Sequence, residues 1–332
     1  MKRTKKMLPA LLGLLLVASM AQAQTKTVKI DGSSTVYPVT EAVAEEFQIA
    51  NKGKINVTVG ISGTGGGFKK FCRGEIDIAN ASRPIVAKEM EACREAGVKY
   101  IELPIAYDAL TVVVNTKNDW IKSMTVAELK KIWEPEAQKT ITTWNQVNPA
   151  WPNEPLKLYG PGADSGTFDY FTEATVGKAK SSRGDFTASE DDNVLVQGVS
   201  RDKGALGYFG FAYYAENSKK LKVVPIIEKA GAPAVTPSFE TIKNGTYQPY
   251  ARPVFIYINA ASLDKPEVKA FIDFYLSKGP DLISQIKFVP LPEKAYTLAK
   301  ENVAKRKTGT GFGGVAEVGV SVEELLQREA KN

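Results

Sequence analysis

The sequence has 332 residues, of which 43% are hydrophobic and 24% are charged, as is typical of a soluble globular protein with two domains. Its formal net charge is +6, but four of the 43 basic residues lie in the first six positions, which hold no acidic residue. Without these four, 39 basic residues remain against 37 acidic ones, a net charge of +2. This balance does not indicate a basic patch, so nucleic-acid binding is not expected.

Residues 1–23 have the pattern of a secretory signal peptide. The basic start is followed by an apolar run from Met7 to Ala18 and by Ala21-Gln22-Ala23, which fits a small-x-small cleavage site. The run is shorter than the ~20 residues that a membrane-spanning helix needs. The first cysteine is Cys72, which excludes a lipid on a new N-terminal cysteine. We therefore expect a soluble exported protein, cleaved after Ala23.

The first part of the mature chain alternates between strand and helix patterns. Strands are expected at 27–30, 55–59 and 76–79, and helices at 36–50, 68–73 and 87–96. This βαβα order favours a mostly parallel sheet with helices on both faces. Cys72 and Cys93 suit one disulfide in an oxidising compartment, the alternative being two buried thiols.

Two apolar runs of similar design, 107–115 and 254–259, each end in an asparagine and precede a helix. The first helix is expected at the capping box Thr125-x-x-Glu128, and the second is expected to start at 264–266 and to close at Gly279. We interpret the two runs as crossings between domains. Residues 24–108 plus 256–332 would form one discontinuous domain and residues 109–255 the other.

Four loops share one design, in which a strand end is followed by glycine, serine or threonine and then by a helix. They are Ser33-Ser34-Thr35, Ser62-Gly63-Thr64-Gly65, Ala81-Ser82-Arg83 and Ser165-Gly166-Thr167. Free N–H groups and the helix dipole make such a helix start suitable for an oxyanion. In open α/β sheets, ligands bind beyond the carboxyl ends of the strands. Since three loops belong to the first domain and one to the second, a shared anion would lie in the cleft between them.

The loops and their flanks also carry charged residues. Arg83 is the one cation inside the four loops, and its position at a loop tip favours a contact with the anion over a surface ion pair. An acid can serve the same site if the ligand keeps a proton, as phosphate does and fully ionised sulfate does not. Asp164 is the first candidate for this proton acceptor, followed by Asp77 and Asp108. Asp164 has two alternative roles, orienting its own loop or pairing with Arg83.

The motifs 31–35, 62–67, 77–84 and 160–168, in this order, resemble the periplasmic phosphate-binding proteins of high-affinity phosphate ABC transporters. The resemblance implies an α/β protein of the type II periplasmic-binding fold, with two α/β domains, two crossover strands and a ligand in the interdomain cleft. It also implies a periplasmic monomer that closes on inorganic phosphate and delivers it to a membrane permease driven by an ATPase. The predicted phosphate-binding residues are Ser34, Thr35, Val36 through its N–H, Ser62, Thr64, Ser82, Arg83, Asp164, Ser165, Gly166 and Thr167.

One feature departs from the pattern of the resembled family. Other members carry an acid where Arg83 stands and an arginine just before their Ser-Gly-Thr segment, where this chain has Asp164. Arginine and aspartate have therefore exchanged loops, which leaves the identity of the proton-accepting carboxylate open.

Three other readings compete with phosphate binding. The first is binding of another oxyanion, such as sulfate or molybdate, and the second is adhesion or matrix interaction by a secreted protein of the same fold. The third is an enzyme, but the chain has no histidine, so a Ser-His-Asp triad is impossible. Ser200-x-x-Lys203 and Ser262-x-x-Lys265 match a Ser–Lys pattern without its S-D-N partner. We therefore expect that the protein is not an enzyme and has no cofactor. We also expect no metal site, since two thiols without histidine are a poor set of zinc ligands.

Overall fold

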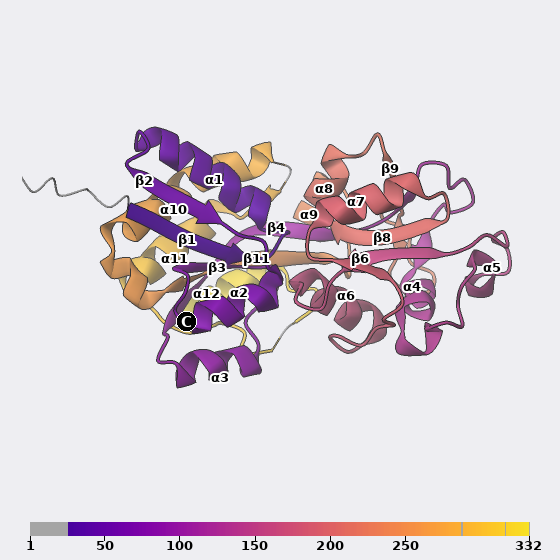
Figure 1. Cartoon of the computed structure of the whole chain (residues 1–332), viewed down its shortest axis with the longest axis horizontal. Coiled ribbons are helices and arrows are strands. Elements are labelled where there is room, and N and C mark those ends of the chain that lie inside the picture. Colours follow the sequence, from indigo (N-terminus) through magenta and orange to yellow (C-terminus); the bar gives the residue numbers. More distant parts are fainter. Residues whose placement is uncertain (1–25, 287, 316, 332) are drawn as a thin grey trace, which may run out of the picture.

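The computed structural model describes residues 26–331 except 287 and 316. The predicted signal segment, residues 1–23, therefore lies outside the described residues. Figure 1 shows two lobes side by side, joined by the long strands β4 and β11. The first lobe contains helices α1–α3 and α10–α12, and the second contains α4–α8.

Ten strands form one curled sheet, in the order β2-β1-β3-β11-β4-β8-β6-β7, with β9 and β12 also paired to β4. Within each lobe, β1 runs parallel to β2 and β3, and β6 runs parallel to β7 and β8. Strand β4 is antiparallel to β11 and β8 and therefore connects the two halves. The strands are β1 (Lys26–Gly32), β2 (Ile55–Val59), β3 (Ile78–Ala81), β4 (Tyr100–Asn115), β5 (Met124–Thr125), β6 (Lys157–Pro161), β7 (Thr187–Ser189), β8 (Ala205–Gly210), β9 (Leu221–Val223), β10 (Ile226–Ile227), β11 (Ala251–Asn259) and β12 (Val289–Pro290).

The helices cover both faces of the two halves of the sheet. They are α1 (Tyr37–Ala50), α2 (Gly63–Cys72), α3 (Ala87–Glu95), α4 (Val126–Trp133), α5 (Trp144–Val147), α6 (Gly166–Val176), α7 (Asp192–Arg201), α8 (Phe211–Glu216), α9 (Phe239–Lys243), α10 (Pro266–Gln285), α11 (Glu293–Ala304) and α12 (Val322–Lys331). The fold is thus the predicted two-lobed α/β type.

Strand β4 changes partners where it passes from one lobe to the other. Its residues from Tyr100 to Ala109 pair with β11, whereas its residues from Leu110 to Val114 pair with β8. All its 16 residues are buried, which explains why it reads as a continuous apolar run. The change of partners supports the predicted domain boundary between 108 and 109, which stays a prediction.

Local signals place most helix starts correctly. The capping box of α4 forms as expected, because Thr125 Oγ1 accepts the Glu128 N–H at 3.0 Å and the Glu128 carboxylate accepts the Thr125 N–H at 2.8 Å. The helix that was expected to start at 264–266 ends later than predicted. Its expected end at Gly279 is wrong, because α10 continues through Gly279 and Pro280 to Gln285. Gly279 is buried between Tyr275 of the same helix and Val43 of α1, where a Cβ would lie 3.3 Å from the Tyr275 ring and 3.9 Å from Val43 Cγ2, so packing against α1 overrides the helix-breaking signal.

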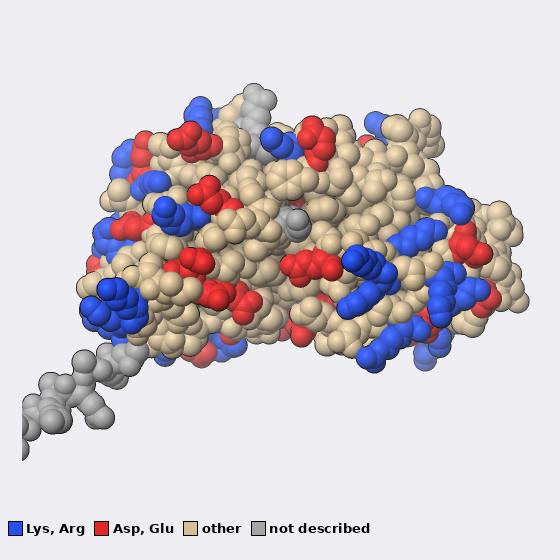
Figure 2. Space-filling model, turned by 90° about the horizontal axis from the view of Figure 1, so that it is seen from above, with Lys and Arg blue, Asp and Glu red and all other residues tan. Residues whose placement is uncertain are grey.

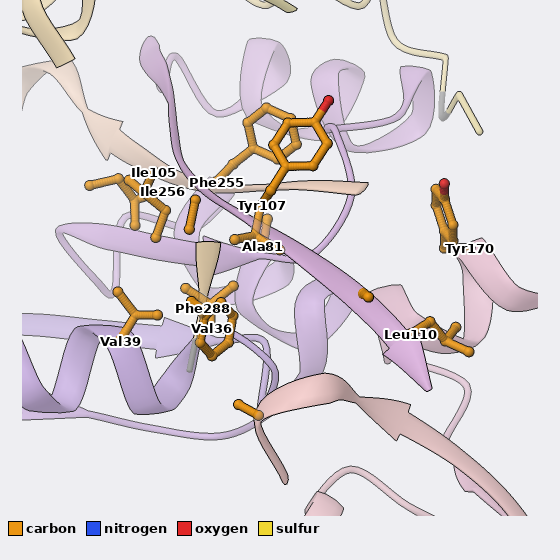
Figure 3. Close-up of a cluster of buried hydrophobic side chains, with 14 of the residues drawn as sticks. Val36, Val39, Ala81, Ile105, Tyr107, Leu110, Tyr170, Phe255, Ile256 and Phe288 are labelled. Atoms are coloured by element: carbon orange, nitrogen blue, oxygen red, sulfur yellow. The ribbon is translucent and has the colours of Figure 1, made fainter. Parts of the chain in front are cut away.

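The core is continuous around the crossing strands. Figure 3 shows apolar side chains of β4 and β11, such as Ile105 and Ile256, together with Val36 and Val39 from the start of α1. This cluster holds the N-terminus of α1 against the crossing strands, and it thereby fixes one of the four predicted loops at the junction between the lobes.

A disulfide joins Cys72 at the end of α2 to Cys93 in α3. The prediction of one bridge is therefore confirmed. Among the described residues, none of the helices combines the length and apolar character that a bilayer crossing requires.

Candidate anion-binding site

The four predicted loops lie where the two lobes meet. In the first lobe, residues 33–35 precede α1, residues 62–65 form the start of α2 and residues 81–83 lie at the end of β3. In the second lobe, residues 165–167 begin α6. The helix expected at 68–73 therefore starts earlier, at Gly63. Ser62 is half-buried, and the other polar side chains of the loops are at most 3% exposed: Ser33, Ser34, Thr35, Thr64, Ser82, Arg83, Ser165 and Thr167. Buried polar groups are costly unless they find hydrogen-bond partners, so this concentration marks a site with a specific polar task.

Five hydroxyl groups from these loops, here called the hydroxyl cluster, belong to Thr35, Thr64, Ser82, Ser165 and Thr167. Thr35 Oγ1 and Thr167 Oγ1 lie 2.9 Å apart and join the two lobes. Thr64 Oγ1 and Ser82 Oγ lie 3.2 Å apart, and Thr64 Oγ1 also accepts the Ser82 N–H at 3.1 Å. Ser165 Oγ caps α6 by accepting the Thr167 N–H at 3.1 Å. The structure therefore brings the predicted hydroxyls of both lobes together.

Two glycines allow the lobes to approach this closely. A Cβ on Gly166 would lie 2.5 Å from Thr64 Oγ1 and 2.7 Å from Ser82 Oγ, so the first turn of α6 faces these hydroxyls directly. A Cβ on Gly63, which has a φ of +75°, would lie 2.6 Å from the carbonyl oxygen of Asp164. Larger residues at either position would hold the lobes apart.

Arg252 supplies a buried cation to the site. It lies on β11 opposite Asp108 of β4 and is 1% exposed. Its Nη2 donates to Thr167 Oγ1 at 2.7 Å and to Asp108 Oδ2 at 3.3 Å, and its Nη1 donates to the Gly166 carbonyl at 3.3 Å. Its Nε has no hydrogen-bond partner among the described residues. Arg252 thus has a free donor beside the hydroxyl cluster.

Arg83, the predicted cation, is occupied by protein groups. Its Nε donates to Asp169 Oδ2 at 2.6 Å across the lobe interface, and both terminal nitrogens donate to the Glu89 carboxylate at 2.8 Å. Its Nη1 also donates to the Pro84 carbonyl at 3.0 Å. Four of the five N–H donors of the guanidinium are thereby used. Burial raises the pKa of Asp169, and the charge of Arg83 opposes this rise. A direct contact of Arg83 with the anion stays a prediction.

Two of the predicted acids have partners outside the hydroxyl cluster. The Asp164 carboxylate, with its side chain 40% exposed, pairs with Lys69 at 2.8 Å. The Asp164 backbone contributes to closure, because its carbonyl accepts the Gly65 N–H at 2.8 Å. Asp77 precedes β3, at the opposite end of that strand from Ser82, and pairs with Lys265 at 2.7 Å.

Asp108 and Asp192 are buried carboxyl groups next to the site. Asp108 is 3% exposed, and burial raises its pKa to about 6 although Arg252 opposes this rise. Asp192, the first residue of α7, is fully buried, and burial together with the charge of Asp108 raises its pKa to about 8. Each of these aspartates therefore holds a proton far more readily than an exposed one.

The remaining predicted binding residues, Val36, Ser34 and Ser62, differ in the contacts that they make. Val36 is buried directly before α1, so its N–H belongs to the helix start. The Ser34 carbonyl accepts the Tyr213 hydroxyl of the second lobe at 2.9 Å. Ser62 Oγ donates to Asp31 Oδ1 at 2.5 Å and is thereby held by its own lobe.

The Ser–Lys patterns do not form nucleophile pairs. Ser262 Oγ and Lys265 Nζ both donate to Asp77 Oδ1 at 2.7 Å, and Ser200 Oγ donates to the Gln197 carbonyl at 2.9 Å. These hydrogen bonds hold Ser262, Lys265 and Ser200 in structural roles. The arrangement at the lobe junction, with hydroxyls, helix N-termini and a buried guanidinium, is chemically suited to binding an oxyanion.

Sequence reasoning did not identify Arg252 or Asp192 as site residues. Arg252 stands just before the predicted crossing run 254–259, and Asp108 stands near the start of the other run. An antiparallel pairing of the two crossing strands would have placed these opposite charges together. No sequence signal indicates the burial of Asp192.

The fold and the site define a class, that of two-lobed binding proteins of the type II periplasmic kind. A family model described as a PBP superfamily domain matches residues 18–278. The protein SphX of Synechococcus elongatus is 57% identical over 312 residues, which cover 94% of this chain and 91% of that protein. The phosphate-binding protein PstS of Staphylococcus saprophyticus is 40% identical over 273 residues, which cover 81% and 82%. The chain therefore belongs to the PBP superfamily and, within it, to the family of the SphX and PstS proteins.

A solved structure agrees with this assignment. It comes from Clostridium perfringens, is described as a phosphate ABC transporter substrate-binding protein and contains bound phosphate. It is 26% identical, has a TM-score of 0.67, and the match covers 80% of this chain and all of that one.

Proposed function

We propose that this protein binds inorganic phosphate between its two lobes and delivers it to a membrane transporter. The observation that carries the proposal is the hydroxyl cluster, which is buried, spans both lobes and lies beside the guanidinium of Arg252. A dianion loses much hydration energy in such a place, and only a shell of donors can replace it. The names of the relatives and the phosphate bound in the Clostridium perfringens structure support the same ligand.

The donors belong to both lobes, so binding and closure are coupled. Thr35, Thr64 and Ser82 belong to the first lobe, and Ser165, Gly166 and Thr167 belong to the second. In the closed arrangement the lobes also touch through the Arg83–Asp169 and Lys69–Asp164 pairs. Phosphate would have to enter and leave through an open state in which these contacts are broken. Arg83 would then support binding mainly by holding the lobes together.

We assign the acceptor of the ligand's proton to Asp108. Asp164 was the first candidate from the sequence, but its carboxylate is half-exposed and pairs with Lys69, whereas Asp108 is buried beside Arg252. A carboxylate at that place accepts a hydrogen bond from protonated phosphate and repels sulfate, which has no proton to offer. The variants Asp108→Asn and Asp164→Asn separate the two candidates, because only the variant of the true acceptor narrows the preference for phosphate over sulfate.

The transport role extends to location and partners. We infer that the cleaved chain acts as a monomer in the periplasm and meets the permease subunits of an ABC transporter, which an ATPase drives. Figure 2 shows basic and acidic side chains on both lobes of one face, in line with a mature chain of nearly balanced charge. Light scattering of the purified protein and cross-linking to the permease in intact cells test these points.

Calorimetric titration of the purified chain with phosphate, sulfate and molybdate tests the proposed function. Binding of phosphate at one site, much tighter than that of the other two anions, is the expected result. Tighter binding of sulfate or molybdate would identify a transporter protein for that anion instead. Absence of all anion binding would overturn the proposal and favour an adhesion or matrix role for the same fold.

A further inference from the structure

Asp192 has an unusual position for a carboxyl group. It is the first residue of α7, its exposed fraction is 0%, and neither of its side-chain oxygens has a hydrogen-bond partner among the described residues. The neighbouring Asp191 provides the helix cap, with its carboxylate accepting the Asn193 N–H at 2.9 Å. Asp192 is therefore not needed as a cap, and its burial requires another explanation.

The charges around Asp192 are mostly negative. Asp108 on β4 and the preceding acids Glu190 and Asp191 oppose its ionisation, whereas Arg252 on β11 favours it. Tyr213 on α8 also lies within its electrostatic reach. One guanidinium thus faces two buried carboxyl groups, and Arg252 makes its hydrogen bond to Asp108. The second carboxyl group is left without a counter-charge, which favours its neutral form.

These neighbours connect Asp192 to the hydroxyl cluster. Arg252 donates to Thr167, and Asp108 lies near Thr35, because a Cβ on Gly210 would be 3.2 Å from Thr35 Cγ2 and 3.7 Å from Asp108 Oδ1. A neutral carboxylic acid carries one O–H donor. Since that donor has no acceptor among the described residues, an oxygen of the bound anion would provide one.

We propose that Asp192 is a carboxylic acid in the closed protein and that its O–H donates a hydrogen bond to the bound oxyanion. This inference rests on the proposed function. The two buried carboxyl groups then have opposite tasks: Asp108, paired with Arg252, accepts the ligand's proton, and Asp192 donates. Burial and the charge of Asp108, which raise the pKa of Asp192 to about 8, agree with this division.

The proposal predicts a specific proton balance. Above a pH of about 8, ligand-free Asp192 is ionised, so the complex forms only when one proton is taken up from solvent together with the anion. Phosphate itself stays singly protonated throughout mildly alkaline solution. The affinity for phosphate should therefore fall about tenfold for each further unit of pH.

The test is calorimetric titration of phosphate between about pH 7 and 10, in buffers with different ionisation enthalpies, which reports the number of protons taken up. Asp192→Asn retains N–H donors but cannot titrate, so it should bind phosphate at all these pH values without proton uptake. Asp192→Ala has no donor and should bind at least about tenfold more weakly at pH 7. Asp191→Asn is the matched control, since it makes the same substitution one residue away and keeps a capping side chain.

Several outcomes would overturn the inference while leaving phosphate binding intact. One is a wild-type protein that binds phosphate without proton uptake at alkaline pH, and another is an Asp192→Asn variant with the wild-type pH slope. Full affinity of Asp192→Ala at pH 7 would show that Asp192 donates no hydrogen bond to the anion. Failure of the wild-type protein to bind phosphate at any pH would instead overturn the proposed function.

Discussion

Replacing Arg252 by methionine should greatly weaken phosphate binding. The substitution keeps a long apolar stem but removes a guanidinium that donates to Thr167 Oγ1 of the hydroxyl cluster at 2.7 Å. The Nε of this guanidinium has no hydrogen-bond partner among the described residues. A hydrogen bond to a charged group contributes about 1.5–3 kcal/mol. Loss of one such bond to a dianion corresponds to roughly a 10- to 150-fold weaker affinity.

The assay is calorimetric titration with phosphate, accompanied by urea unfolding to check that the variant is folded. Arg183→Met is the matched control. Arg183 is also a buried arginine, but it lies within the second lobe, where it donates to Asp185 and to the carbonyls of Ile132 and Ile141. This control should lose stability and keep its phosphate affinity. An Arg252→Met variant that is folded and binds phosphate within about threefold of wild type would refute the reasoning.

Four further predictions follow from the same contacts. Arg83→Ala should weaken phosphate binding by roughly tenfold, because the contact that helps to close the lobes is lost. In a double-mutant cycle measured by calorimetry, adding Asp169→Asn to Arg83→Ala should weaken phosphate binding little further, and additive effects would contradict a shared role. Gly166→Ala should reduce phosphate affinity by more than about tenfold, because the new Cβ would lie 2.5 Å from Thr64 Oγ1, and unchanged affinity would contradict the observed approach of the lobes. Cys72→Ser should lower the free energy of unfolding by about 3 kcal/mol, measured in urea, because the bridge closes a loop between residues 21 apart; no change on reduction would argue against the bridge. Below a pH of about 6, Asp108 becomes protonated and sulfate binding should strengthen, whereas Asp108→Asn should show no such rise.

The pH effect of Asp108 on stability has a defined sign. Its pKa in the folded protein is raised from the ordinary 3.8 to about 6, so the folded state binds this proton more tightly than the unfolded chain. The stability that this proton provides is fully present below a pH of about 4 and is lost as the pH rises through about 6. Thermal unfolding of wild type and Asp108→Asn should therefore show a difference in stability between the two proteins that changes over this pH range, because the other carboxyl groups titrate in both.

Local chemistry in the sequence was sufficient to predict the polar residues of the four loops and several elements of the fold. Strand 55–59 agrees with β2 residue for residue, and the capping box at Thr125 forms as expected. The hydroxyls of Thr35, Thr64 and Ser82 could be predicted together because parallel strands end at the same edge of a sheet. In each of these segments, residues that are close together in the sequence determine the conformation.

The charged part of the site could not be predicted in the same way. The register of β4 against β11 places Arg252 opposite Asp108, and such a register depends on long-range packing. Arg83 was expected at the anion, but Glu89 on α3 and Asp169 on α6 occupy its donors, and both partners come from other elements. Gly279 was expected to end a helix, but the helix continues where Gly279 packs against Val43 of α1. In each case a tertiary contact decides the outcome.

The central claim is that one phosphate ion is held by both lobes at once. The most direct measurement is a crystal structure of the protein grown with phosphate. We expect an anion whose oxygens accept hydrogen bonds from Thr35 in the first lobe, from Thr167 in the second and from the guanidinium of Arg252. An anion bound by one lobe alone, or at a place away from the hydroxyl cluster, would contradict it.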